Sequence, residues 1–245
     1  EKYKVYGELI NTYGYNLEPG SKELTALNYY TNEEITIPLD PTQTPGENAQ
    51  RYFAKYNKQK RTFEALTELI QETADDIQYL ESISNALDIA LNEADLAQIK
   101  EELMQSGYIR RKHTKKKVKL TSKPMHYISS DGYDMYVGKN NLQNEELTFS
   151  FANGNDWWFH AKGAPGSHVI VKSGGDELPD CTFEEAGRLA AYYSKNRGAD
   201  KVEIDYIQKK HVKKPNGAKP GFVVYYTNYS LVIDSDISNI KNVQD

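Results

Sequence analysis

Apolar residues in the first half of the chain recur every three or four positions. Positions at this spacing run from residue 52 to residue 91, and they are apolar except at Gln59, Thr73 and Ser84. Alternating steps of three and four are typical of a helix in a coiled coil. We therefore predict one helix over 45–91, with Pro45 in its first position and Thr44 and Glu47 forming a capping box at its start.

A helix of this length, roughly 70 Å at 1.5 Å per residue, needs a partner along its apolar side. Residues 1–13 show the same periodicity and predict a helix that returns antiparallel to it. Between the two helices, 24–30 and 34–39 read as the strands of a β-hairpin at the tip. A long helix lying on a globular core is the alternative, and the length disfavours it. A further helix is predicted over 93–106, ended by Gly107, and it completes a first domain over 1–109.

From Met125 the period changes to two, which indicates strands. One helix interrupts them, with Thr182 as its N-cap, Glu185 completing a second capping box and Gly198 at its end. The fold class is therefore α+β: a helical coiled-coil arm with a hairpin tip, followed by a β-rich α+β domain over 125–245. The predicted strands are 125–129, 133–138, 147–151, 156–161, 168–172, 201–207, 222–227 and 230–233.

Charge divides the chain in the same way. Residues 1–109 carry a net charge of −10 and residues 110–245 a net charge of +5. Such asymmetry suggests two modules with different partners. The linker 110–124 is rich in Lys and Arg and contains no acid, so it is either a solvated tether or a phosphate-contacting segment.

Composition indicates the cellular compartment in which the protein is expected. Cys181 is the single cysteine of 245 residues, which suits a reducing cytosol. No apolar run is long enough to cross a bilayer, so we expect no membrane insertion, and the first residues do not resemble a signal peptide. Because the chain starts without Met and already in helical pattern, we expect it to be part of a longer protein.

Catalytic motifs are missing from the second half. His160 and His168 have no acid or thiol at a ligand spacing, which disfavours a zinc site, and Ser167 stands in no nucleophile elbow. We therefore expect no enzyme activity, metal or cofactor. Trp157 and Trp158 should point to opposite faces of a strand, one into the core and the other free to stack on a base.

Basic residues beside these aromatic residues suggest a polyanion partner. The loop 209–221 contains five lysines among prolines and glycines, a composition that cannot form a core. RNA recognised by shape and stacking fits better than duplex DNA. The candidate nucleic-acid-binding residues are Lys139, Asn140, Asn141, Trp157, Trp158, His160, Lys162, Ser167, His168, Lys209, Lys210, Lys213, Lys214 and Lys219.

Four segments of the second half resemble a known family. GKNNLQNEELTF, DWWFHAKGAPGSHVIV, AAYYSKNRGADKVEIDY and VKKPNGAKPGFVVY are similar to the NFACT-R domain that ends the fibronectin-binding protein A, RqcH and NEMF-like family of ribosome quality-control factors. Residues 1–109 resemble the distal part of the middle coiled-coil domain of that family.

The resemblance implies a cytoplasmic protein that binds the large ribosomal subunit with a stalled nascent chain, and tRNA for C-terminal alanine tailing. Some relatives from Gram-positive cocci are also described as fibronectin-binding surface adhesins, with a role in virulence, that lack a signal peptide. The resemblance therefore leaves two partners open, a ribonucleoprotein and fibronectin. The unpaired apolar side of the long helix also predicts self-association.

Overall fold

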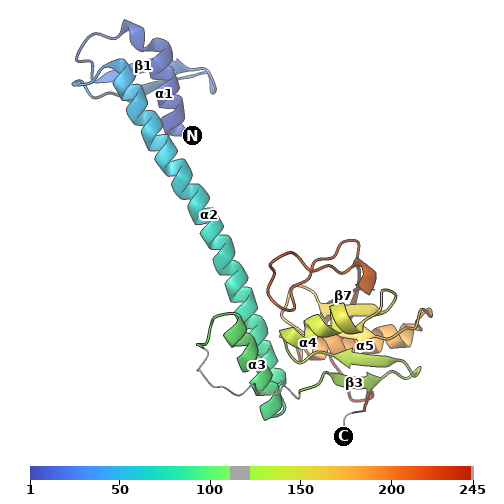
Figure 1. Ribbon diagram of the computed structural model, residues 1–245. Helices are drawn as coiled ribbons and strands as arrows, with labels where there is room; N and C mark the ends of the chain where they lie inside the picture. Colours follow the sequence, from blue (N-terminus) through green and yellow to red (C-terminus); the bar gives the residue numbers. More distant parts are fainter. Residues whose placement is uncertain (111–121, 244–245) are drawn as a thin grey trace. The chain divides into compact units, whose positions relative to one another are not determined.

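A computed structural model describes residues 1–110 and 122–243 (Figure 1). Most of the predicted linker 110–124 therefore lies outside the described residues. The chain forms two compact units, Glu1–Asp75 and Asp76–Asp245, and helix α2 (Pro45–Ile89) contributes to both. The fold is a mixed α+β fold, as predicted, but the second unit begins within α2 and not at the linker. Its packing, described below, explains that boundary.

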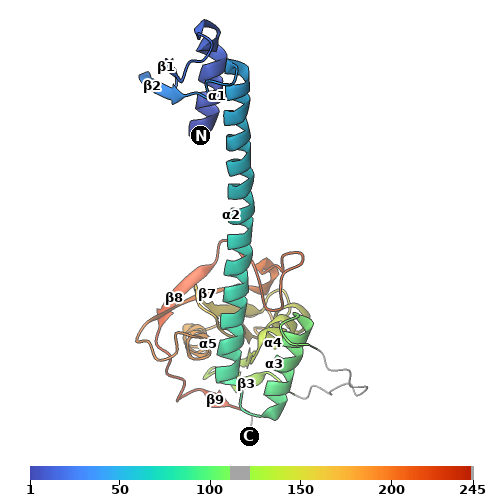
Figure 2. The same cartoon turned by 90° about the vertical axis from the view of Figure 1, so that its left-hand side faces the viewer.

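The first unit contains the predicted hairpin. Helix α1 (Lys2–Tyr13) and the short helix η1 (Gly14–Asn16) precede strands β1 (Glu23–Asn28) and β2 (Glu33–Pro38). The two strands pair antiparallel in one continuous register. Figure 2 shows α1 alongside the first turns of α2, with the hairpin at the same end.

Helix α1 runs antiparallel to α2, as predicted. Gly14 lies at the start of α2, where a side chain at this glycine would meet Pro45. Seven residues earlier, an added Cβ at Gly7 would lie 2.8 Å from the Phe53 ring, so only glycine allows the two helices to approach this closely. The core of the unit joins both helices and the hairpin through Leu9, Ile10, Leu24, Ala26, Ile37, Ala49 and Tyr52.

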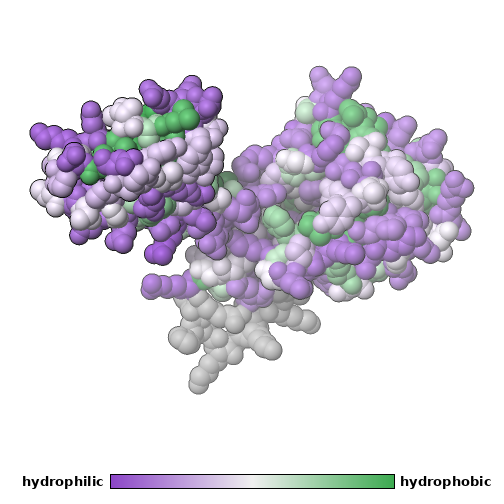
Figure 3. Space-filling view, turned by 90° about the horizontal axis from the view of Figure 1, so that it is seen from above, coloured by the Kyte–Doolittle hydropathy of each residue, from purple (hydrophilic) through white to green (hydrophobic). Residues whose placement is uncertain are grey.

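Helix α2 confirms the predicted start. The Thr44 amide donates to Glu47 Oε2 at 2.7 Å, and the Glu47 amide donates to Thr44 Oγ1 at 3.3 Å, which is the reciprocal capping box. Beyond the turns covered by α1, the apolar side of α2 is exposed at Phe63, Leu66 and Ile70. In the view of Figure 3 the surface is mostly hydrophilic, and hydrophobic residues form separate patches.

The second unit is built on a seven-stranded sheet in which every neighbouring pair is antiparallel. The strand order is β8-β7-β5-β6-β4-β3-β9. The strands are β3 (Met125–Ile128), β4 (Asp134–Val137), β5 (Trp157–Ala161), β6 (Val169–Val171), β7 (Val202–Gln208), β8 (Tyr229–Ile233) and β9 (Lys241–Asn242).

Both faces of this sheet are covered. Helix α5 (Asp180–Tyr192) packs on one face and buries Ala186, Leu189 and Ala190 against alternate residues of the central strands. The opposite face carries helix α4 (Asn141–Glu146), the π-helical turn η2 (Leu147–Phe151) and the segment that follows β7. A sheet covered on both sides needs apolar residues at successive strand positions, which the three buried residues of β6 show.

A helical hairpin belongs to the same unit. The end of α2 packs against α3 (Glu93–Gln105), and Tyr79, Ile83, Ala86 and Ile99 are buried between them. The Asn92 side chain caps α3 by accepting from the amides of the second and third helical residues, which confirms the predicted start at residue 93.

Two predicted strands are wrong. The alternating sequence Leu147–Phe151 forms the π-helical turn η2, since α4 starts at the Asn140 cap and the helix continues through this segment. Residues 222–227 form no named strand; their sheet-like contact is a single bridge between Val224 and Lys213. Strand β9, only two residues long, was not predicted.

The predicted boundaries of the second-domain helix are also wrong. Helix α5 starts at Asp180 and ends at Tyr192. Thr182 and Glu185 form no capping box: Thr182 donates to Asp131, and Glu185 accepts from the Ser130 amide at 2.8 Å. Both side chains therefore connect α5 to the turn between β3 and β4.

Candidate functional site

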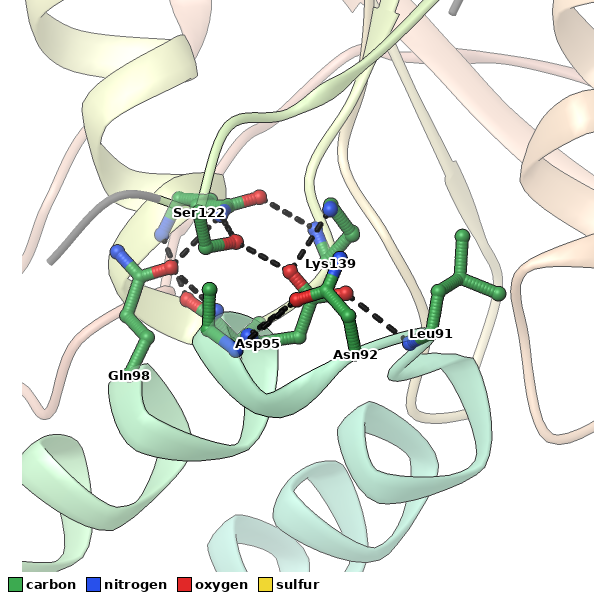
Figure 4. Close-up of polar contacts among 9 residues, drawn as sticks. Leu91, Asn92, Asp95, Gln98, Ser122 and Lys139 are labelled. Carbon is green, nitrogen blue, oxygen red and sulfur yellow. Dashed lines mark hydrogen bonds and ion pairs between the residues drawn. The ribbon is translucent and has the colours of Figure 1, made fainter. Parts of the chain in front are cut away.

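The GKNN segment lies inside the protein, between the sheet unit and the helical hairpin. Lys139 is 5% exposed, and its Nζ lies 2.8 Å from Asp95 Oδ1 on α3. Figure 4 shows the hydrogen bonds around this pair, including those from Ser122 and from the Leu91 amide to Asp95. Burial opposes ionisation of Asp95, but the hydrogen bonds that it accepts outweigh this effect and lower the pKa of its carboxyl.

The two asparagines extend this connection. Asn140 caps α4 with its side-chain oxygen and donates from Nδ2 to Gln98 Oε1 at 2.9 Å. Asn141 donates to Ser82 Oγ at 2.7 Å and to Glu102 Oε1 at 2.9 Å. Burial raises the pKa of Glu102. We call Lys139, Asn140, Asn141 and their partners on α2 and α3 the polar joint.

The polar joint explains why the second unit includes the end of α2. Buried polar groups of α3 have their hydrogen-bond partners in the GKNN segment, so separating the two would leave buried groups unsatisfied. These three predicted site residues therefore hold the helical hairpin against the sheet unit. Their side chains are not at the surface, where a phosphate could reach them.

The histidines line a small pocket of about 190 Å³. His168 is buried, and its Nδ1 lies 2.7 Å from Thr148 Oγ1. His160 lies edge-to-face with it, with ring centroids 5.5 Å apart. Burial lowers the pKa of His160 to about 4, and burial and then the neighbouring His160 lower that of His168 well below its usual value. Both rings are therefore neutral at pH 7 and attract no phosphate.

The loop 163–168 forms one wall of this pocket, and residues 220–223 form another. Ser167 is buried and its amide donates to the Tyr193 carbonyl at 2.9 Å. The structure thus brings the predicted GAPGSH loop together with both histidines. Across residues 1–110 and 122–243, no three His, Cys, Asp or Glu side chains are placed to hold a metal ion.

The tryptophans point to opposite faces, as predicted, but the sheet is covered on both. Trp158 is fully buried, with the His160 ring stacked at 5.6 Å and Tyr225 at 4.9 Å. Trp157 is half-buried on the α5 face, where Phe183 packs edge-on at 4.9 Å. Trp158 is therefore a core residue, and Trp157 lies among Phe183, Tyr206 and Tyr229, whose ring centroids are within 6.5 Å of its own.

Besides Lys139, three further predicted lysines are paired with carboxylates. Lys162 pairs with Glu203, and Lys214 with Glu145 at 2.7 Å. Lys219 pairs with Asp76 on α2 and lies 4.6 Å from the centroid of the Tyr79 ring. Their charges are offset locally, so a phosphate would have to compete with a protein carboxylate for each.

The remaining three lysines are open. Lys209, Lys210 and Lys213 follow β7 in and after the short helix η3 (Lys209–His211), and no described residue forms an ion pair with them. Their main chain is fixed, because the Lys209 amide donates to Asp156 at 2.8 Å and the Lys213 amide to Val224 at 2.9 Å. A rigid backbone with unpaired ammonium groups is suited to a polyanion.

An aromatic ring that was not among the predicted site residues, that of Phe149, lies next to one of these lysines. Lys209 Nζ lies 5.8 Å from the centroid of the Phe149 ring, and Phe151, two residues further along, is 41% exposed. We call Lys209, Lys210, Lys213, Phe149 and Phe151 the lysine–aromatic surface. The two phenylalanines were hidden by the reading of 147–151 as a strand, in which they would have shared one face.

Comparisons with known proteins identify both parts of the chain. Residues 1–122 match the NFACT N-terminal and middle domains, and residues 123–226 match the NFACT protein RNA binding domain. The chain is 43% identical over 245 residues to the Rqc2 homolog RqcH of Streptococcus pneumoniae, and 40% identical over 247 residues to that of Bacillus subtilis. The match to the Streptococcus pneumoniae protein includes 100% of this chain and 44% of the length of that relative. The match to the Bacillus subtilis protein includes 98% of this chain and 42% of the length of that relative.

A solved structure is also similar. The C-terminal part of the fibronectin/fibrinogen-binding protein from Streptococcus suis matches with a TM-score of 0.73 and 37% sequence identity. The match covers 97% of this chain and 86% of the other.

Proposed function

This chain belongs to the NFACT family, and from that premise we propose that it is the RNA- and ribosome-binding part of a ribosome quality-control factor. The RNA-binding domain of the family and the RqcH relatives support this role. The observation that carries the proposal is the lysine–aromatic surface. It combines unpaired ammonium groups for phosphates with the exposed Phe151 ring and the half-buried Phe149 ring for bases, the two elements that single-stranded RNA recognition requires.

Membership of the family supports a finer proposal. The chain binds the large ribosomal subunit with a stalled nascent chain and contributes to the binding of tRNA for C-terminal alanine tailing. It acts by binding and not by catalysis, and it works in the cytoplasm. Among the helices that the structure describes, none is long and apolar enough to cross a membrane.

A salt titration tests the RNA-binding role. We expect the affinity of the chain for tRNA and for large ribosomal subunits to fall as salt rises, because phosphate contacts release counterions. Replacing Lys209, Lys210 and Lys213 together with Ala should reduce the log–log salt slope by about 2 to 3, at 0.7 to 0.9 per lost phosphate contact.

The matched control removes the same charge elsewhere. Lys162, Lys195 and Lys201 are exposed, and the first two are paired with Glu203 and Glu81. Their triple replacement with Ala should leave the slope nearly unchanged. Equal losses from both triple variants would mean that net charge, and not the lysine–aromatic surface, carries binding.

The Streptococcus suis structure favours a second function, because that protein is described as fibronectin/fibrinogen-binding. In this alternative the chain is a surface adhesin that contributes to virulence. Nanomolar binding to fibronectin, together with no retention of tRNA or large subunits at 50 mM salt, would support the adhesin and contradict the RNA-binding role.

A further inference from the structure

A second pocket opens beside the lysine–aromatic surface. It has a volume of about 330 Å³ and is lined by Lys123, Pro124, His126, Tyr136, Glu146, Leu147 and Phe151. None of these residues except Phe151 belongs to the surface described above, and none was a candidate from the sequence. The pocket lies on the same face of the sheet as α4 and η2, opposite α5.

Its walls are planar rings held in fixed positions. The His126 ring stacks on Tyr136 at 4.5 Å with 3° between the planes. The Phe151 ring meets Tyr136 edge-on, at 4.7 Å and 71°. His126 is oriented in turn by Asp134, whose Oδ1 lies 2.7 Å from Nε2. The rings thus form a corner in which a flat heterocycle can lie on one ring and touch the edge of another.

Phe151 is the exposed wall of this corner. The ammonium group of Lys172 lies 4.8 Å from the centroid of the Phe151 ring and donates to the Phe151 carbonyl at 3.3 Å. Lys172 is fixed by its pair with the buried Asp156. The ring is therefore held in an exposed position, although burial would be favourable for it.

Charge around the pocket indicates which part of a nucleotide enters. Two exposed residues of opposite charge, Lys123 and Glu146, line the pocket. A carboxylate repels a phosphate and accepts a hydrogen bond from the amino group of a base. A base whose amino group meets Glu146, with its phosphate at Lys123, agrees with both charges.

Asp156 connects the wall of the pocket to the first of the open lysines. Asp156 pairs with Lys172 at the pocket, and its carbonyl accepts from the Lys209 amide at 2.8 Å. A phosphate backbone that follows Lys209 and Lys210 therefore passes close to the Phe151 corner. This connection favours a single-stranded nucleic acid over an apolar peptide as the occupant.

We propose that the Tyr136–Phe151 corner binds one unpaired nucleobase of an RNA strand whose phosphates lie along the lysine–aromatic surface. This proposal rests on the RNA-binding role proposed above. The corner supplies stacking, while the lysines supply attraction that depends on salt.

The test uses the chain itself and a ten-nucleotide oligouridylate with one central 2-aminopurine. Binding should quench the 2-aminopurine fluorescence as the base stacks on the rings. Phe151→Ala should abolish most of this quenching and weaken binding about 5- to 150-fold, the effect of losing one base–aromatic stack. Because no charge is removed, the salt slope should remain that of the wild type.

Tyr226→Ala is the matched control, since Tyr226 is a 74% exposed aromatic residue outside the pocket. It should retain wild-type affinity and quenching. Thermal melts of both variants check that the fold is intact, which is expected because both rings are exposed. If the wild type binds RNA with an affinity that falls as salt rises, and Phe151→Ala binds equally well with equal quenching, the pocket proposal is wrong while the RNA-binding role stands. If the wild type binds no RNA at any salt concentration, the RNA-binding role itself fails, and the base pocket with it.

Discussion

Lys139 and Lys210 show two opposite uses of the same side chain within one unit. Lys139 is buried and paired with Asp95, which is also buried. Lys210 is exposed and has no ion pair with any described residue. The first lysine stabilises the attachment of the helical hairpin, and the second is available to a partner. A lysine therefore indicates a binding site only when its charge is not already offset by the protein.

The largest expected effect is on the polar joint. Lys139→Ala removes one partner of a buried ion pair and leaves Asp95 uncompensated, so we expect a loss of about 3 to 5 kcal/mol in the free energy of unfolding. Urea denaturation at pH 7 measures it. The protein that remains folded should bind RNA with an unchanged salt slope, because Lys139 reaches no phosphate.

Lys210→Ala provides the opposite result in the same assays. Its stability should stay within about 0.5 kcal/mol of the wild type, as for other surface substitutions, while RNA binding weakens. A destabilised Lys210→Ala, or a Lys139→Ala protein that is fully stable and binds RNA less well, would reverse the assignment of the two lysines.

Local signals predicted much of the fold correctly. The Thr44 and Glu47 box, the hairpin and the long helix follow from turn, cap and periodicity rules that act within a few residues. The open lysines of the loop after β7 were also among the predicted residues. These features depend on neighbours in the sequence, and so the sequence alone can reveal them.

The misassigned residues depend on distant partners. Lys139 is buried because Asp95 lies across from it, 44 residues earlier. The alternation in Leu147–Phe151 suggests a strand, but the helix that starts at Asn140 continues into this segment. Trp157 was a candidate for exposure because nothing in its strand shows that α5 covers that face. Tertiary contacts decide all three cases.

The same contrast between buried and exposed positions occurs along α2 for apolar side chains. Tyr79 and Ile83 are buried against α3, whereas Phe63, Leu66 and Ile70 are exposed. We expect two copies of the chain to associate through the exposed stretch, since each side chain buried there contributes about 1.5 to 3 kcal/mol. Sedimentation velocity at several concentrations measures this association.

Ile70→Glu should weaken the free energy of association by the contribution of one such side chain, about 1.5 to 3 kcal/mol, and so shift the protein towards monomer. Asn57→Glu, which adds the same charge at another exposed position of α2, is the control and should associate like the wild type. A wild-type chain that remains monomeric at the highest concentration would show that the exposed stretch is not an association surface.

The smallest predicted effect concerns basic groups that carry no charge, the pair His160 and His168. Their folded-state pKa values lie below the ordinary value of 6.5, and that of His160 is about 4. Between pH 6.5 and pH 4 the unfolded chain binds protons at His160 that the folded chain does not, so stability must fall as the pH falls through this window. The full shift corresponds to roughly 3 kcal/mol at 1.36 kcal/mol per unit, and partial exposure of His160 reduces this to about 1 to 2 kcal/mol.

His160→Phe removes the titrating group, and the difference between its stability–pH profile and that of the wild type isolates the contribution of His160 from those of the buried carboxyls. Parallel profiles from pH 7 to pH 4 would show that His160 can bind its proton in the folded state, and the pocket would then have to be counted among the positively charged surfaces at low pH.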